Sequence, residues 1–236
     1  MSLEAEFGVK ILRGNDYAVI EEAEKVPFVR FEELIYNAKK KLVHEELKKI
    51  VLVLEGDLDR LVLETLKNEG FQHTKKRCRY EFDFQKPFPF PLDRRICLQS
   101  IDEIGETAFL SLWEQAAGRS QAKRDYTSLK SELGKTYKRS CYGIILEDKG
   151  IGIALPHIEP GTEQEGRLFF IGLIPAFRGK GFGVEAHRHA LYILKERFLA
   201  ENYVGMTDED NLPMKQIFYA NHCIKTSDVN IFTYEI

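Results

Sequence analysis

The most constraining feature of the sequence is a glycine-rich turn between a predicted strand and a predicted helix. Residues 168–173 form a nearly unbroken apolar run, which indicates a buried strand. From Gly183 onward, apolar residues recur at spacings of three and four, which predicts an amphipathic helix. Three glycines, Gly179, Gly181 and Gly183, alternate with other residues in the turn. A strand that runs into a helix through such a turn is typical of an α/β fold.

This turn has the properties of a binding site for a pyrophosphate group. Glycines carry no Cβ atom, so the backbone amides beside them can approach a ligand closely. The first turn of a helix offers unpaired N–H groups and a partial positive charge. Arg178 and Lys180 add two full positive charges at the same place. We therefore predict that the turn holds a pyrophosphate.

Other phosphate-binding motifs fit the turn less well. A P-loop requires Gly-x-x-x-x-Gly-Lys-Ser/Thr, which the residues after Gly181 do not supply. A dinucleotide fingerprint requires Gly-x-Gly-x-x-Gly, whereas the glycines here follow the pattern Gly-x-Gly-x-Gly. Asp208 follows the next predicted strand, so a nucleotide-binding protein stays an alternative. A second alternative is that the glycines serve only to form a tight turn.

A longer pattern extends on both sides of the turn. Arg178-x-x-Gly181-x-Gly183 follows Leu173-x-Pro175, in the order strand, proline, glycine turn and long helix. This pattern resembles the acetyl-CoA signature of the GNAT superfamily of N-acetyltransferases. The resemblance covers about residues 95–236. A second block is similar to the family's next strand and short helix: Gly205-Met206-Thr207-Asp208, Asn211-Leu212-Pro213-Met214 and Phe218-Tyr219.

The resemblance implies a fold and a cofactor. The fold is α/β, with a mixed, mostly antiparallel sheet, helices on both faces and a V-shaped splay between two central strands. The cofactor is acetyl-CoA, used as a cosubstrate without a metal. In the family, one strand edge pairs with the pantetheine arm and the following amides hold the pyrophosphate. The implied cofactor-binding residues are Ile171, Gly172, Leu173, Arg178, Gly179, Lys180, Gly181, Phe182, Gly183, Val184, Asn211 and Phe218.

The implied activity is transfer of an acetyl group to an amine that attacks the thioester directly. The acceptor is a small-molecule amine or a peptide amine, and the sequence does not identify it. The departing thiolate is helped by an acid. The family often has a Tyr for this purpose about seven residues after the Asn, where this sequence has Phe218. Tyr219 is the candidate acid, although one residue rotates a helical side chain by ~100°.

The general base is less clearly indicated. Met206 occupies a strand position where some relatives carry a carboxylate. Location alone nominates Glu163, Glu165 and Asp208. His187 lies on the apolar stripe of its helix, which predicts a hydrogen-bonded histidine in the core.

A catalytically degenerate acyl-CoA-binding sensor or regulatory module is the main alternative function. Phe218 and Met206 both favour it, because each replaces a side chain that some relatives use in catalysis. Release of CoA thiol in the presence of amines would distinguish an enzyme from a sensor.

The segment 86–92, Lys-Pro-Phe-Pro-Phe-Pro-Leu, is the clearest break in the chain. Alternating prolines favour an extended path without backbone donors. We predict an N-terminal α/β part at 1–86, a Pro-rich linker at 87–94 and the GNAT-like domain at 95–236; an edge segment of one continuous domain is the alternative. The order of elements in 31–84 suggests a degenerate GNAT-like half or an unrelated α/β cap, and either could help select the acceptor.

Periodicity and turn residues predict the remaining elements. Asp57 is the predicted cap of the second helix, and residues 118–125 are a predicted loop beside the acceptor. The predicted strands are 9–13, 17–21, 50–54, 71–84, 96–101, 142–146, 150–155, 168–173, 203–206 and 229–234, and the predicted helices begin near 31, 58, 104, 129, 183 and 211.

Composition excludes several classes of protein. The formal net charge is −3 without a basic excess, so nucleic acid is not an expected partner. No apolar stretch approaches the ~20 residues that span a bilayer. The four cysteines and the histidines lack metal-ligand spacing, and scattered cysteines suit the cytoplasm. A basic cluster at 75–79 suits an exposed strand edge or an anionic ligand, and the strand-like end of the chain is compatible with a homodimer.

Overall fold

The computed structural model describes residues 2–14, 16–45, 47–162 and 164–236, and the chain divides into two compact units. The first unit contains Met1–Arg79, Met206–Asp210 and Thr226–Ile236, and the second contains Tyr80–Gly205 and Asn211–Lys225. This division differs from the boundaries expected at 86 and 95. Three long or late strands contribute residues to both units, so the units are not consecutive along the chain.

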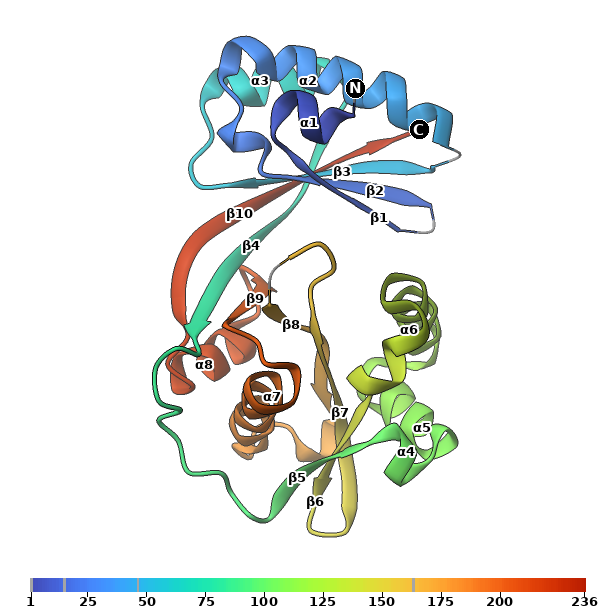
Figure 1. Ribbon diagram of the computed structural model, residues 1–236, viewed down its shortest axis with the longest axis vertical. Helices are drawn as coiled ribbons and strands as arrows, with labels where there is room; N and C mark the ends of the chain where they lie inside the picture. Colours follow the sequence, from blue (N-terminus) through green and yellow to red (C-terminus); the bar gives the residue numbers. More distant parts are fainter. Residues whose placement is uncertain (1, 15, 46, 163) are drawn as a thin grey trace. The chain divides into compact units, whose positions relative to one another are not determined.

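The first unit is a sheet with its helices on one face (Figure 1). Its strand order is β1-β2-β3-β10-β4, and β2 and β3 pair in parallel. Residues of all three helices and of β2, β3 and β10 form one hydrophobic core. The elements are α1 (Leu3–Phe7), β1 (Lys10–Arg13), β2 (Tyr17–Glu21), α2 (Phe28–Leu42), β3 (Lys49–Glu55), α3 (Arg60–Asn68), β4 (Gln72–Asp83) and β10 (Ile224–Glu235), with short 3₁₀ turns at Ala23–Lys25 and Val43–Glu45.

The helices of the first unit follow the predicted apolar spacing closely. The buried residues of α2 are Phe31, Leu34, Ile35, Ala38 and Leu42, which confirms the predicted stripe. The prediction that Asp57 caps α3 is wrong by two residues, because the N-cap is Asp59. The side chain of Asp59 accepts a hydrogen bond from the Leu61 backbone and begins the helix there.

The basic cluster on β4 is paired with carboxylates of the same unit. Such pairing neutralises the cluster and fits an exposed sheet surface better than a site for an anion. The pairs are Lys75 and Arg77 with Asp208, Lys76 with Glu209, and Arg79 with Glu55.

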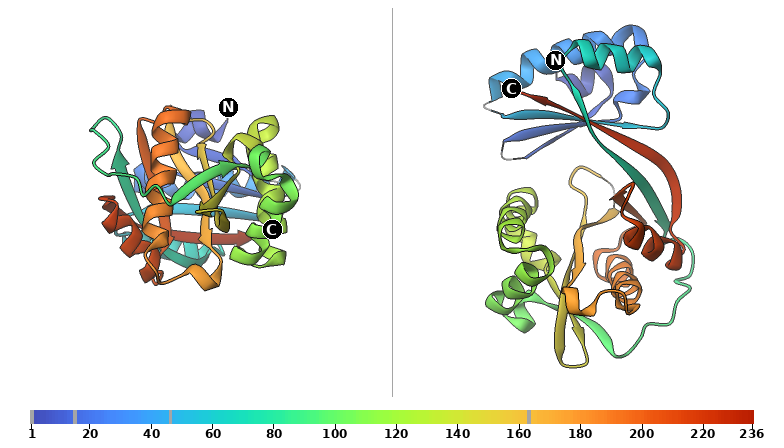
Figure 2. Two further views of the ribbon diagram at one scale, coloured as in Figure 1. Left: turned by 90° about the horizontal axis from the view of Figure 1, so that it is seen from below. Right: turned by 180° about the vertical axis from the view of Figure 1, so that it is seen from behind.

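The second unit has helices on both faces of a mixed sheet (Figure 2). Its strand order is β4-β9-β8-β7-β6-β5, in which the pairs from β5 to β8 are antiparallel and β8 and β9 are parallel. One core lies between the sheet and α7, and another lies between the sheet and the helices α5 and α6. The elements are β5 (Ile96–Ser100), α4 (Ile101–Ile104), α5 (Glu106–Ala117), α6 (Arg119–Leu133), β6 (Tyr142–Leu146), β7 (Lys149–Ile158), β8 (Glu165–Leu173), α7 (Phe182–Phe198), β9 (Asn202–Asp208) and α8 (Leu212–Ala220), with 3₁₀ turns at Gly134–Ser140 and Pro175–Phe177.

The segment expected as a loop at 118–125 is helical instead. Gly118, with φ of 86°, forms the joint between α5 and α6, and α6 begins at the next residue. The buried residues Ala122, Tyr126 and Leu129 give α6 a stripe with helical spacing. The sequence pattern missed this stripe because an alanine and a tyrosine among charged neighbours give a weak apolar signal.

The predicted linker packs against the second unit as an extended strap. The rings of Phe88 and Phe90 lie 5.8 Å from Tyr192 and 4.7 Å from His222, measured between centroids. The Arg188 guanidinium lies 4.5 Å from the centre of the Phe90 ring. These contacts show that residues 87–94 belong to the packing of α7 and α8.

Candidate cofactor-binding site

The glycine-rich turn connects the end of β8 to the start of α7. Gly179 and Gly181 have φ angles of 71° and 84°, and Gly181 is the residue that caps α7. A Cβ atom at either position would meet no atom within 4 Å. The backbone conformation therefore requires glycine there, and the space beside both glycines is open to a ligand.

The start of α7 has no capping side chain in the part of the chain that the structure describes. The Val184 N–H donates to the Gly181 carbonyl, so the N–H groups of residues 182 and 183 are the donors at the helix start that can bind an anion. Gly183 serves packing, because its Cβ would lie 2.9 Å from Cδ1 of Ile217 on α8. The close approach of these two helices fixes the direction in which α7 presents its N-terminus.

The basic side chains of the turn have different surroundings. Nε of Arg178 donates to the Leu173 carbonyl at 2.9 Å, and its Nη2 donates to the Ala116 carbonyl at 2.7 Å. Lys180 is exposed, with Nζ 5.8 Å from the centre of the Phe177 ring. Arg178 therefore bridges the ends of β8 and α5, whereas the Lys180 ammonium lies near the Phe177 ring.

Lys149 is a third cation at this turn that the sequence analysis did not identify. It begins β7, and its Nζ lies 5.2 Å from the centre of the same Phe177 ring. No sequence pattern connects Lys149 with the turn, because only the pairing of β7 with β8 brings them together.

The strands β8 and β9 separate soon after they begin. Their described pairing consists of Glu165 with Asn202 and Gly166 with Tyr203, although β8 continues to Leu173. The Ile174 N–H donates to the Ile151 carbonyl on β7. Because successive backbone N–H groups of a strand point to opposite edges, the N–H groups of residues 171 and 173 point away from β7. They lie along the edge that β9 leaves unpaired.

A bulge in β8 changes which side chains face each side of the sheet. Ala154 pairs with Ile171 and Pro156 pairs with Leu168, so β8 has one extra residue between these positions. As a result, Phe169 and Phe170 both pack into the core with α5 and α6.

The residues expected from α8 lie in three different environments. Phe218 is 1% exposed and stacks on Tyr80 with ring centroids 4.5 Å apart, so it is part of the core. Tyr219 is 55% exposed, and its hydroxyl accepts a hydrogen bond from Tyr80 at 3.2 Å. Oδ1 of Asn211 accepts from the Met214 N–H and caps the helix. The adjacent Phe and Tyr thus face different directions, as the helical rotation predicts.

The residue after the C-cap of α8 has a left-handed backbone. His222 has a φ angle of 55°, in the region that favours glycine. Its ring packs against Phe90 of the strap, with ring centroids 4.7 Å apart.

The carboxylates nominated as general bases are engaged in ion pairs or lie outside the described residues. Glu163 lies outside them. Glu165 accepts a hydrogen bond from Arg167 at 2.6 Å. Burial acts to raise the pKa of Asp208, but hydrogen bonds from Arg77 and Lys75 outweigh burial, and the pKa is lowered overall. A carboxylate with a lowered pKa is a weak proton acceptor near neutral pH.

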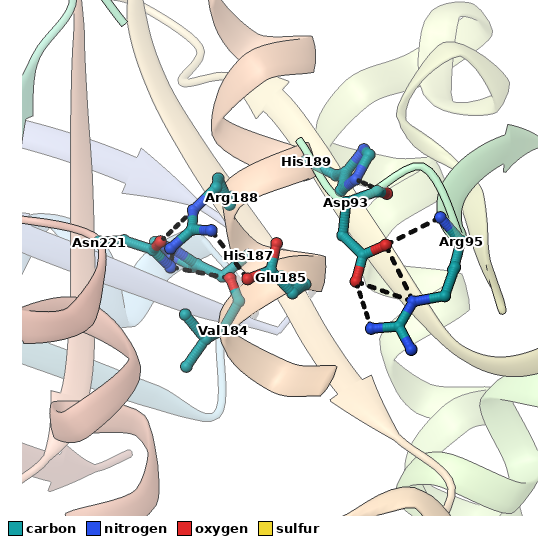
Figure 3. Close-up of polar contacts among 8 residues, drawn as sticks. All are labelled: Asp93, Arg95, Val184, Glu185, His187, Arg188, His189 and Asn221. Atoms are coloured by element: carbon teal, nitrogen blue, oxygen red, sulfur yellow. Dashed lines mark hydrogen bonds and ion pairs between the residues drawn. The ribbon is translucent and has the colours of Figure 1, made fainter. Parts of the chain in front are cut away.

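A buried polar network begins at the first turn of α7 (Figure 3). The side chain of Asn221 is fully buried, and its Nδ2 donates to the Val184 carbonyl at 3.0 Å. Its Oδ1 accepts from Nε of Arg188 at 3.1 Å, and Arg188 also donates to Glu185. The end of α8 is therefore bonded to the helix start that the glycine turn leads into.

His187 continues this network into the core. Its Nδ1 lies 3.1 Å from Nδ2 of Asn221, and its Nε2 lies 3.2 Å from the Tyr203 hydroxyl. Burial, assisted by the charge of Arg188, lowers the pKa of His187 to about 3. The prediction of a hydrogen-bonded core histidine is confirmed.

The strap is fixed to α7 by a second group of contacts in the same region (Figure 3). Nε2 of His189 lies 3.1 Å from the Asp93 carbonyl, and Arg95 binds the Asp93 carboxylate. Hydrogen bonds from Arg95 lower the pKa of Asp93 to about 2.

The parallel strands β8 and β9 thus open beside a glycine-rich helix start, as the resemblance to the GNAT superfamily implies. The family model described as "Acetyltransferase (GNAT) family" matches residues 98–220, and the chain belongs to this family. The fold class expected from the sequence is confirmed, with the splay between β8 and β9.

Solved structures of the same fold cover nearly the whole chain. A GCN5-related N-acetyltransferase from Sphaerobacter thermophilus has a TM-score of 0.65 at 13% identity, over 96% of this chain and 76% of that one. A tandem GNAT protein from the clavulanic acid biosynthesis pathway has a TM-score of 0.65 at 12% identity, over 96% and 78%. A GCN5-related N-acetyltransferase from Kribbella flavida has a TM-score of 0.63 at 10% identity, over 95% and 89%. At these identities the likeness concerns the fold alone.

No curated protein matches the sequence. Within the described ranges, no group of three or more His, Cys, Asp or Glu residues is placed to hold a metal ion. Among the helices of those ranges, none has the length and apolar character needed to cross a membrane.

Proposed function

We propose that the chain is an N-acetyltransferase that binds acetyl-CoA along β8 and transfers the acetyl group to an amine. The observation that carries this proposal is the unpaired edge of β8 next to the glycine turn. The N–H groups of Ile171 and Leu173 point to that edge, and the turn ends in an uncapped helix start. A pantetheine arm can pair with the edge as an added strand, while the pyrophosphate contacts the amides of residues 179–184.

The same edge can support the chemistry. An amine that attacks the thioester creates a negative oxygen, and the N–H groups of residues 171 and 173 are donors of the kind that stabilise it. The Leu173 carbonyl already accepts from Arg178, so its N–H is the group left for the ligand. The acceptor is a small-molecule amine or a peptide amine.

Calorimetry with acetyl-CoA tests the cofactor site. The Gly179→Glu, Gly181→Glu double variant places two carboxylates where the pyrophosphate would bind, because a Cβ at either position meets open space. We expect micromolar binding to the natural chain and a loss of ~100-fold or more in the variant, from lost amide contacts and like-charge repulsion. Gly161→Glu is the matched control, because Gly161 also has a positive φ angle and open surroundings but precedes β8.

The alternative functions give different results. Release of CoA from acetyl-CoA in the presence of a panel of amines supports an acetyltransferase. Binding of acetyl-CoA without release of CoA supports an acyl-CoA sensor, in which Phe218 has replaced the catalytic tyrosine. Binding of ATP or NAD that CoA does not compete with would contradict the proposal and indicate a nucleotide-binding protein.

The order of elements in the first unit supports the proposal that it is a degenerate GNAT-like half rather than an unrelated α/β cap. The order β2, α2, β3, α3, β4 parallels the order β8, α7, β9, α8, β10. However, β2 and β3 pair over four consecutive positions, and the segment 22–27 between β2 and α2 contains no glycine. The first unit thus lacks both the open edge and the turn. We infer one cofactor site per chain, and a stoichiometry of two in the same calorimetry would contradict this.

A further inference from the structure

Tyr203 carries a hydroxyl hydrogen that no described group accepts. Tyr203 is 1% exposed, and within the described residues its hydroxyl has one polar partner, Nε2 of His187. The direction of that bond follows from the other side of the imidazole. Nδ1 of His187 faces the amide nitrogen of Asn221, which can only donate, so Nδ1 accepts.

The orientation of the Asn221 amide is fixed independently. Its nitrogen also donates to the Val184 carbonyl, and its oxygen accepts from Nε of Arg188, which has no acceptor capacity. His187 is neutral and has one ring hydrogen, which must therefore be on Nε2 and must point to the Tyr203 oxygen. The hydrogen of Tyr203 itself is left to be donated elsewhere.

The position of this hydroxyl is at the opening of the sheet. Gly166 and Tyr203 form the last described pair of β8 and β9. The Tyr203 oxygen lies 2.5 Å from the point that a Cβ of Gly205 would occupy. The hydroxyl thus extends along β9 beyond the last pair, and the missing side chain of Gly205 makes room for it.

Phe218 shares this location. Its Cζ and Cε1 atoms each lie 2.8 Å from the same Gly205 point. Phe218 occupies the position at which the family resemblance implies a tyrosine acid. A hydroxyl is therefore present beside the tip of the Phe218 ring, but it comes from Tyr203 on β9 and not from α8.

A buried donor without an acceptor costs ~1–3 kcal/mol, so a ligand group that accepts from it is a physical reason for its presence. If acetyl-CoA binds as proposed above, its pantetheine runs from the glycine turn along β8 towards the last pair with β9. The acyl end then reaches the part of the sheet where the Tyr203 hydroxyl lies.

We propose that Tyr203 donates a hydrogen bond to the thioester sulfur of acetyl-CoA, and that His187 and Asn221 are positioning residues that aim its hydroxyl. The nitrogen–carbon bond forms and the carbon–sulfur bond breaks, with the electron pair moving to the sulfur. The amine's proton passes to water. Burial raises the pKa of Tyr203 well above its usual value, so Tyr203 keeps its hydrogen and stabilises the thiolate without transferring a proton.

Free CoA is the probe for this proposal. The thiol of bound CoA can be titrated by the ultraviolet absorbance of its thiolate, as a difference against the protein alone. We expect the pKa of the bound thiol to be ~1 unit lower with the natural chain than with Tyr203→Phe, a tenfold change in its ionisation constant. The nearest titratable groups do not interfere, because burial lowers the pKa of His187 to about 3 and raises the pKa of Cys223 to about 12.

Two further variants define the result. Tyr192→Phe removes a hydroxyl from a 40% exposed tyrosine on α7 and should leave the titration unchanged. Tyr203→Phe combined with Phe218→Tyr moves the hydroxyl from one ring to its neighbour and should restore a lowered thiol pKa.

Calorimetry with CoA separates the two proposals. Absence of binding to the folded natural chain would contradict the proposed function itself. Equal affinity and equal thiol pKa in the natural chain and Tyr203→Phe would overturn the role of Tyr203 and leave the cofactor site intact.

Discussion

At the scale of the residue, Arg178 shows how a motif residue acquires its role from the backbone around it. The sequence motif predicts it to be a positive charge for the pyrophosphate. In the structure its guanidinium bridges the carbonyls of Leu173 and Ala116. Leu173 is the last residue of β8, and Ala116 is the next-to-last residue of α5. A planar group with several fixed donors can hold two carbonyls at once, whereas an ammonium group binds as a point charge.

We expect Arg178→Ala to weaken acetyl-CoA binding by ~10-fold, because the turn loses its attachment to β8 and α5. Arg178→Lys should be nearly as weak, since lysine keeps the charge but cannot bridge both carbonyls. Calorimetry at low and high salt measures both effects. Two results together would show that charge alone matters: Arg178→Lys binds acetyl-CoA like the natural chain, and the loss of affinity in Arg178→Ala becomes smaller at high salt.

At the scale of the element, the close contact of β7 with β8 holds the strand that ends in the cofactor turn. A Cβ on Gly152 would lie 2.2 Å from the Gly172 carbonyl oxygen and 3.0 Å from Cα of Leu173. Backbone atoms in a paired strand cannot move aside. A Cβ on Gly150, two residues earlier in β7, would instead meet the end of the flexible Leu112 side chain at 2.7 Å.

We therefore expect Gly152→Ala to lower the free energy of unfolding by ~3 kcal/mol and Gly150→Ala by ~1 kcal/mol. Gly152→Ala should also weaken acetyl-CoA binding, because it displaces the end of β8. Urea unfolding and calorimetry provide the measurements. Equal destabilisation by the two variants would show that the strands can separate locally without cost.

Most elements could be predicted from the sequence because local patterns specify them. The alternation in 17–21 and the stripe of α2 each mark an element directly. The first half of α6 was missed because its apolar stripe is weak. The glycine turn was located correctly, since positive φ angles require glycine at Gly179 and Gly181. The contacts of Arg178, Lys149 and Tyr203 were not predictable, because their partners are distant in sequence and are chosen by strand pairing.

At the scale of the whole molecule, the order of the chain does not follow the order of the units. Residues near both ends of the sequence contribute to the first unit. The C-terminal strand β10 lies between β3 and β4, and its residues Val229 and Phe232 are buried there. The Pro-rich segment, which marks a boundary in the sequence, lies within the second unit and not between the two units.

A fragment that ends at residue 86 should therefore fail to fold, because it lacks β10 from the middle of its sheet. We expect a loss of cooperative urea unfolding and of most secondary structure in circular dichroism. In the full chain, Phe232→Ala should cost ~3–5 kcal/mol in the transition that reports the first unit. A cooperative transition of fragment 1–86 like that of the full chain would contradict this account.

The late position of β10 also has a consequence for protein synthesis. A ribosome makes the helices and early strands of the first unit long before it makes residues 226–236, which complete that unit's sheet. Until those residues leave the ribosome, β3 and β4 lack the strand that separates them, and their edges stay open to other chains. The nascent chain thus depends on the release of β10 to close a unit whose other strands and helices are made much earlier.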